Sequence, residues 1–245
     1  MAARPWKFES SPGHQSTGDA PRVAATGPPS EAVAEQETQL ANALHRSDLP
    51  DGLDLGPLVA IDCETMGLNV PRDRLCMVQL SAGDGDAHLV QFPPGDESGY
   101  AAPNLKALLA DRRTTKLFHF GRFDIAVIER YLSVRCEPVY CTKIASKLTR
   151  TFTDRHGLKD LCRDLLGVEL SKQQQSSDWG ATTLTQEQIN YAASDVLHLH
   201  RLKEKLDEML RREGRSEAAA ACFRFLPTRA HLDLAGWSTE DIFSH

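Results

Sequence analysis

The sequence has no uninterrupted apolar run of about 18 residues, the length that a membrane-spanning helix needs. Its first residues, MAARPWKFESSPGHQ, also lack the apolar core of a secretory signal peptide. Both absences argue against a membrane protein and against a secreted one. We therefore expect a cytoplasmic protein that makes no contact with a membrane.

The spacing of the cysteines fits neither a disulfide framework nor a zinc site. The chain of 245 residues contains six cysteines, and no two of them form a C-x-x-C pair. Isolated cysteines of this kind behave as small apolar side chains and stay reduced in the cytosol. We expect neither disulfides nor a zinc site.

A broadly basic surface is also missing, since the formal net charge is −6. Proteins that coat nucleic acid through charge alone need such a surface, so this class is excluded. Positive charge is concentrated between residues 143 and 159, where five basic residues accompany Asp154 alone among the acids. This segment fits a local phosphate-binding surface, while a solvated helix face or a subunit interface fits it nearly as well.

The beginning of the chain differs in composition from the remainder. Its first 40 residues contain five of the thirteen prolines and almost no periodic apolar pattern. Such a composition cannot bury enough apolar surface to offset the loss of chain entropy. We predict a disordered extension over residues 1–42 and one globular domain over residues 43–245.

Short β-rich runs alternate with helical ones from about residue 47 onward, which predicts an α/β fold. Strands are predicted at 58–63, 74–82 and 87–92, and the turn residues between them favour an antiparallel meander. A fourth strand is predicted at 115–120.

Helices are predicted after the meander and after the fourth strand. The first, NLKALLAD, has Asn104 as its expected N-cap, and RFDIAVIERYL follows the fourth strand. Further helices fit TKIASKLTR and GLKDLCRDLLG. A long helix from Thr185 to Gly214 opens with Thr185 and Gln188 spaced as a capping box, and its apolar residues recur every three or four positions.

Acidic residues stand out against this background at three places. Asp62 and Glu64 lie two positions apart at the end of the first strand, so both side chains leave the same face. Asp124 lies in the first turn of a predicted helix, and Tyr191 and Asp195 lie four apart on the capped helix. A solvated strand end, a first-turn acid favoured by the helix dipole and an ordinary helix face explain each feature singly.

The ordered set of these residues resembles the DEDD superfamily of 3′-5′ exonucleases, in the subclass whose last motif contains tyrosine. Asp62 and Glu64 match the first motif, Asp124 the second, and Tyr191 and Asp195 the third. The segments KIASKLTRTFTDRHGLKDLC, SKQQQSSDW, YAASDVLHLHRL and CFRFLPTRAHLDLAGWSTEDIF further resemble nanoRNase C, a family of short bacterial relatives of ribonuclease D. The resemblance extends over roughly residues 46–245.

The resemblance implies a ribonuclease H-like, DnaQ-like exonuclease fold, with a mixed central sheet flanked by helices and extra C-terminal helices. It implies two Mg²⁺ or Mn²⁺ ions, with Asp62, Glu64 and Asp195 at one ion and Asp62 and Asp124 at the other. Carboxylate oxygens suit these hard cations, and no Cys/His cluster competes for a softer one. Tyr191 would orient the attacking water, because a phenol with a pKa near 10 is a poor base at neutral pH. The resemblance also implies a homo-octameric ring.

The substrate-binding residues are less closely defined. Leu68, in DCETMGL, resembles the leucine that wedges between bases in oligoribonuclease-like members, and core packing explains it equally well. His119 lies in HFGRFD, where many superfamily members have asparagine, and Lys172 could present a donor to a phosphate. Trp179 fits the core better than a base stack.

Three hypotheses follow for function. The leading one is a metal-dependent 3′-5′ exoribonuclease that hydrolyses very short RNA, dinucleotides above all, to nucleoside 5′-monophosphates. The second is a general ribonuclease D-like exonuclease that trims longer RNA or DNA, although the helical nucleic-acid-binding domains of long ribonuclease D have no counterpart in this sequence. The third is a noncatalytic nucleic-acid-binding scaffold, which would have no need of four acids beside a phosphate.

Overall fold

The computed structural model describes residues 42–96, 99–171, 174 and 177–244. The described residues belong to one compact unit, Gln39–His245. The predicted disordered extension, apart from residue 42, lies outside the described residues, and so does Lys172. None of the described helices is long and apolar enough to cross a membrane.

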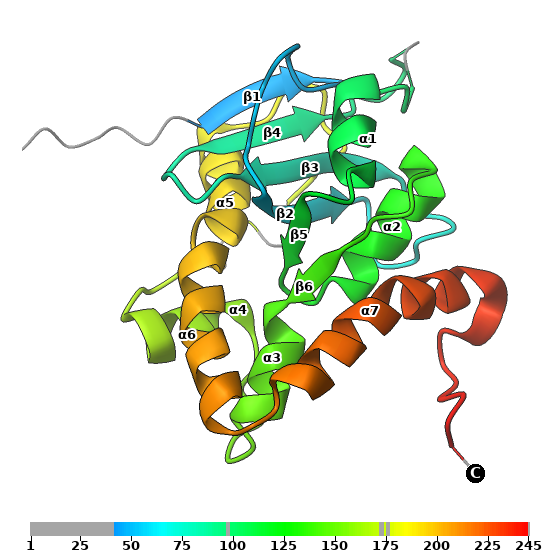
Figure 1. Cartoon of the computed structure of the whole chain (residues 1–245). Coiled ribbons are helices and arrows are strands. Elements are labelled where there is room, and N and C mark those ends of the chain that lie inside the picture. Colours follow the sequence, from blue (N-terminus) through cyan, green and yellow to red (C-terminus); the bar gives the residue numbers. More distant parts are fainter. Residues whose placement is uncertain (1–41, 97–98, 172–173, 175–176, 245) are drawn as a thin grey trace, which may run out of the picture. The chain divides into compact units, whose positions relative to one another are not determined.

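A six-stranded mixed sheet forms the centre of this unit, as expected from the resemblance, in the order β1-β4-β3-β2-β5-β6 (Figure 1). The β2-β3-β4 segment is the predicted antiparallel meander, whereas β1 pairs parallel to β4, and β5 and β6 continue parallel to β2. The strands are β1 (Asn42–Arg46), β2 (Leu58–Thr65), β3 (Leu75–Ser81), β4 (Ala87–Gln91), β5 (Thr115–Phe118) and β6 (Val139–Cys141).

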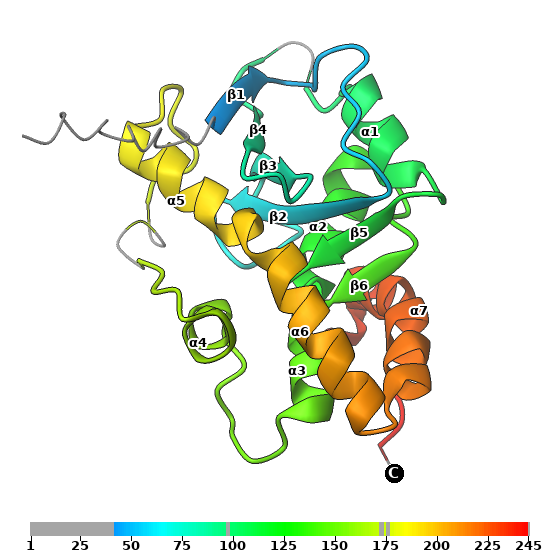
Figure 2. The same cartoon turned by 60° about the vertical axis from the view of Figure 1, so that its left-hand side comes forward.

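Helices cover both faces of the sheet. In Figures 1 and 2, α5 lies on one face, and α1 and α2 lie on the other. The helices are α1 (Pro103–Ala110), α2 (Arg122–Leu132), α3 (Thr142–Thr149), α4 (Leu158–Leu161), α5 (Gln186–Leu197), α6 (Leu199–Arg212) and α7 (Ser216–Leu232), with π-helical turns after α4 (Cys162–Leu166) and α7 (Asp233–Trp237). α6 is the second half of the long helix predicted from Thr185 to Gly214, and α7 follows it as a further C-terminal helix.

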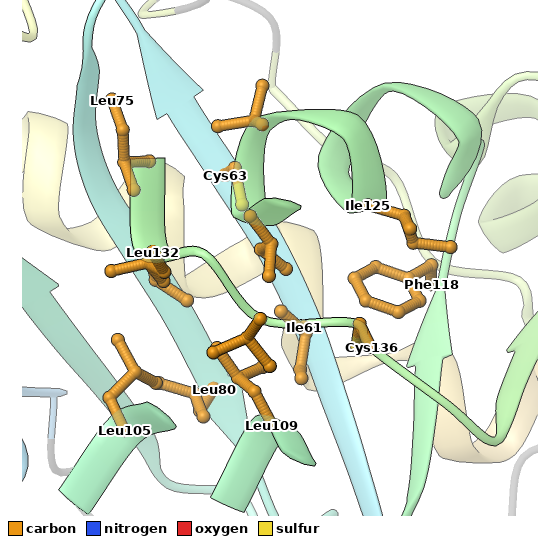
Figure 3. Packing of buried hydrophobic residues seen from close by; sticks show 14 of the residues in the cluster. Ile61, Cys63, Leu75, Leu80, Leu105, Leu109, Phe118, Ile125, Leu132 and Cys136 are labelled. Atoms are coloured by element: carbon orange, nitrogen blue, oxygen red, sulfur yellow. The ribbon is translucent and has the colours of Figure 1, made fainter. Parts of the chain in front are cut away.

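Two hydrophobic cores follow from this arrangement because β2 alternates between the faces. Ile61 and Cys63 point into what we call the α2-side core, where they pack with residues of α1 and α2 (Figure 3). Ala60 points into the α5-side core. Trp179 is 4% exposed and belongs to the α5-side core, which confirms the packing role predicted for it.

Several details differ from the sequence-based expectation. Ala102, not Asn104, is the N-cap of α1, because the carboxylate of Asp48 accepts the backbone N–H groups of Asn104 and Leu105. The predicted long helix is interrupted at His198, between α5 and α6. Two residues later, the Nε2 of His200 donates to the carbonyl of Leu58 at 3.0 Å, which ties the start of α6 to β2.

The short strands β1 and β6 were not predicted, and the fourth strand ends at Phe118 rather than at residue 120. The capping box at the start of α5 is present as expected. The side chain of Thr185 accepts from the backbone of Gln188, and the side chain of Gln188 accepts from the backbone N–H of Thr185. This box fixes the first turn of the helix that contains Tyr191 and Asp195.

Candidate active site

The first acid pair lies where β2 passes beneath α5. Asp62 and Glu64 share a strand face with Ala60, so both side chains point toward α5, while Cys63 between them points into the α2-side core. Asp195 is on α5 itself. Carboxylate oxygens of Asp62, Glu64 and Asp195 all lie within 4.8 Å of one another. Residues from the first strand of the meander and from a helix far along the chain therefore form one group.

Asp124 joins this group from the first turn of α2. Its side chain is 4% exposed, and its pKa is raised by burial and then by the charge of Asp62. Backbone hydrogen bonds from Asp124 itself and from Cys63 partly oppose this shift. We call Asp62, Glu64, Asp124 and Asp195 the acidic cluster.

The acidic cluster is electrostatically costly when it holds no cation. Burial raises the pKa of Asp62 to about 7, and it raises the pKa values of Glu64 and Asp195 well above their ordinary range. The charge of Asp62 adds to the shift at both. In the part of the chain that the structure describes, no Lys or Arg forms an ion pair with any of the four. Carboxylates that are buried, like Asp124, or half-buried, like the other three, and that lack a basic partner suit a hard divalent cation such as Mg²⁺.

Tyr191 faces the same group from α5, one turn before Asp195. Its pKa is raised by burial and then by the charges of Asp195, Glu64 and Asp62. The phenol therefore remains protonated at neutral pH, where it can donate a hydrogen bond but cannot act as a base.

The three predicted substrate-binding residues lie in different surroundings. Leu68 is 85% exposed on the loop after β2, so core packing does not explain it. His119 is half-buried, with its Nδ1 2.9 Å from the hydroxyl of Thr142, and desolvation lowers its pKa to about 3. Lys172 lies outside the described residues. Within the basic segment, Arg150 is buried and pairs with Asp164, which makes it a structural residue.

Gln79 is a polar neighbour of the cluster that was not among the predicted site residues. It lies directly opposite Asp62 in the β2–β3 register and is 0% exposed. Neither atom of its amide has a hydrogen-bond partner among the described residues. The signal was available, since a glutamine inside the apolar run RLCMVQLSA is a buried polar group that needs an explanation.

A mixed sheet on which β2, α2 and α5 bring four acids together is typical of metal-dependent nucleases. The chain belongs to the 3′-5′ exonuclease family, whose family model matches residues 33–211. Among solved structures, it is similar to Brucella melitensis NrnC, a nanoRNase C. The NrnC structure bound to pGG is 56% identical, with a TM-score of 0.80 over 84% of this chain and 99% of that one. NrnC with bound Mg²⁺ is also 56% identical, with a TM-score of 0.78 over 83% of this chain and 98% of that one.

A curated relative extends the comparison to larger enzymes. Ribonuclease D of Gluconacetobacter diazotrophicus is 33% identical over 165 residues, which are 67% of this chain and 41% of that protein. The chain thus spans about two fifths of the length of this relative. The predicted superfamily and the predicted fold are both confirmed by these comparisons and by the observed sheet.

The raised pKa values lead to a prediction about stability without metal. An acid whose pKa is higher in the folded state stabilises the fold below its unfolded pKa, and this contribution is lost as pH rises through the folded pKa. For Asp62 that window runs from about 4 to about 7. In EDTA, we expect the melting temperature to fall between pH 5 and pH 8, and we expect Mg²⁺ to raise it more at pH 8. Differential scanning calorimetry measures both, and an equal Mg²⁺ effect at both pH values would contradict the assignment.

Proposed function

We propose that this chain is a divalent-cation-dependent 3′-5′ exoribonuclease that hydrolyses very short RNA, dinucleotides above all, to nucleoside 5′-monophosphates. Its similarity to NrnC bound to pGG, over 99% of that chain, carries the proposal. The acidic cluster supports the chemistry, and the similar NrnC structure with bound Mg²⁺ supports this cation over a softer one. The proposal extends to DNA of the same length as a second substrate.

Asp62, Glu64 and Asp195 would hold one cation, and Asp62 with Asp124 would hold a second, either Mg²⁺ or Mn²⁺. When bound, such cations supply Lewis-acid activation of water and neutralise charge on the phosphate. The chain's own residues determine the geometry of attack. Asp62 is central because its charge acts on Glu64, Asp124 and Asp195 alike.

Tyr191 would position the attacking water by hydrogen bond. Its protonated phenol lies beside Asp195, so a water held between the phenol and the carboxylates would keep one orientation. Leu68, which projects from the loop after β2, would contact the bases at the scissile step. His119, which is hydrogen-bonded to Thr142, would position the turn between β5 and α2 against the substrate. Lys172 would donate a hydrogen bond to a phosphate.

Assembly and location belong to the same proposal. We propose a homo-octameric ring in the cytoplasm, as the resemblance to nanoRNase C implies. Large apolar side chains exposed near the C-terminal end, Trp237, Ile242 and Phe243, support a contact with other copies of the chain.

An RNA ladder tests the reaction. RNAs of two to twenty nucleotides with a 5′ label should shorten from the 3′ end in Mg²⁺, and every released product should be a nucleoside 5′-monophosphate. Excess EDTA should stop the reaction, and added Mg²⁺ should restore it. The proposed chemistry would be contradicted by internal cleavage, by 3′-monophosphate products or by hydrolysis in EDTA.

A further inference from the structure

Phe120 has a backbone conformation that side chains of its type seldom adopt. Its φ is 64°, in the left-handed region that glycine and asparagine tolerate and that is unfavourable for a bulky residue. The residue lies in the turn between β5 and α2, four positions before Asp124. Such strain persists only where the surroundings impose it, and it is concentrated at functional sites.

Contacts on both sides impose this conformation. On the N-terminal side, the Nδ1 of His119 forms a hydrogen bond with the hydroxyl of Thr142. On the C-terminal side, the carbonyl of Phe120 accepts from the backbone N–H of Phe123 at 3.3 Å. Gly121 packs so tightly that a Cβ there would lie 2.6 Å from the Cβ of Phe118. The turn is therefore held in place by its neighbours.

Core packing does not explain the ring that this turn presents. The Phe120 side chain is 49% exposed, although an exposed phenyl ring gains little from burial and its backbone is strained. The ammonium group of Lys143 lies 4.0 Å from the ring centroid. A position with this φ and this exposure favours glycine or asparagine unless the ring itself has a use.

Two cavities meet at Phe120. It lines one of about 740 Å³ together with Leu68, and another of about 300 Å³ together with Lys143. Lys143 lines only the second of these two cavities, so the side of the ring toward Leu68 remains open. None of the four acids lines the larger cavity, but two of its lining residues are close to them in the sequence: Leu68 comes four positions after Glu64, and Phe120 comes four positions before Asp124.

We propose that Phe120 is a substrate-binding residue whose ring stacks on a nucleobase of the RNA, with Leu68 on the other side of the same cavity. An aromatic face accepts any base, and a cation on its far face strengthens the interaction with the near one. Lys143 adds positive charge where an RNA phosphate would pass. This inference rests on the proposed function, and it assigns the base-binding surface to a residue outside the acidic cluster.

Binding of a 5′-phosphorylated diguanylate with a non-hydrolysable linkage, measured by calorimetry in Mg²⁺, tests the assignment. Phe120→Ala should raise the dissociation constant by roughly 10-fold or more, as expected for loss of one base stack. Phe120→Trp should bind within a few-fold of the wild-type protein because it keeps an aromatic face. An analogue lacking both bases should bind equally to the wild-type protein and to Phe120→Ala.

Phe152 offers a matched control. It is 79% exposed, and the guanidinium carbon of Arg150 lies 5.9 Å from its ring centroid, yet it lines neither cavity. Phe152→Ala should leave the affinity unchanged. Phe120→Asn should lower the affinity like Phe120→Ala while keeping or raising the melting temperature, because asparagine tolerates this φ. A purely structural role would instead lower the melting temperature and leave the affinity alone.

The outcomes separate this inference from the proposed function. If the wild-type protein binds and hydrolyses diguanylate but Phe120→Ala does so equally well, the base-stacking role is wrong and the proposed function stands. The base-stacking role is also wrong if Phe120→Ala changes only the oligomeric state in size-exclusion chromatography, because the ring then contacts another copy of the chain. If the wild-type protein neither binds nor hydrolyses short RNA, the proposed function itself is wrong.

Discussion

Replacing Asp62 by asparagine is expected to abolish hydrolysis of short RNA while leaving the protein folded. The amide keeps the size of the side chain but removes the charge that acts on Glu64, Asp124 and Asp195. A neutral amide is a far weaker ligand for Mg²⁺ than a carboxylate. Turnover should fall to the limit of detection, and Mg²⁺ binding by calorimetry should be lost with it. The metal-free variant should be at least as stable as the wild-type protein at pH 8, because a half-buried charge that repels the other three acids has gone.

Two further variants make this result specific. Glu204→Gln removes an exposed carboxylate on α6 and should change neither turnover nor Mg²⁺ binding. Tyr191→Phe should keep Mg²⁺ binding but slow turnover on the order of 10²-fold, within the range for a group that positions a proton. Substantial hydrolysis by Asp62→Asn in Mg²⁺ would contradict the role of the acidic cluster. An unchanged rate for Tyr191→Phe would mean that the Tyr191 hydroxyl has no role in the reaction and that the ring only packs.

Much of the fold could be predicted because its signals are local. The apolar run 58–61 and the alternation after it define β2, and the capping box at Thr185 and Gln188 defines the start of α5. The meander followed from turn residues between adjacent strands. In contrast, β1 and β6 have five and three residues, and they are strands only through pairing with β4 and β5. Pairing of that kind leaves little trace in a short stretch of sequence.

The acids of the candidate site could be predicted for a different reason. Each one alone is ambiguous, but their order along the chain resembles a known family, and the structure brings them together as that order implies. Phe120 could not be found in this way, and the glutamine inside the apolar run RLCMVQLSA signals a buried polar group without placing Gln79 beside Asp62. The importance of Gln79 depends on a strand register, and that of Phe120 depends on a backbone angle and on a cavity shared with Leu68. Both are properties of tertiary structure.

A strong preference for 5′-phosphorylated dinucleotides is the second large effect that we expect. Processive degradation of long RNA needs a series of backbone contacts, each of which adds salt-dependent affinity. The chain has a net charge of −6, and Arg150 of its basic segment is buried against Asp164 rather than available to phosphate. A dinucleotide, by comparison, needs only the acidic cluster, a base-binding surface and a donor for its terminal phosphate.

A dinucleotide without the 5′ phosphate should therefore be hydrolysed with a lower kcat/KM. A hydrogen bond to a charged group contributes about 1.5–3 kcal/mol, so removal of the 5′ phosphate should lower kcat/KM by roughly 10- to 100-fold. The unphosphorylated dinucleotide is the matched control, since its bases and scissile bond are the same.

The most direct test of the central claim compares kcat/KM for a 5′-phosphorylated diguanylate and for a single-stranded RNA of twenty nucleotides, each in Mg²⁺ with purified protein. We predict a clearly higher kcat/KM for the diguanylate, and no hydrolysis of either substrate in EDTA. An equal or higher kcat/KM for the RNA of twenty nucleotides would contradict the dinucleotide assignment and favour a general ribonuclease D-like exonuclease.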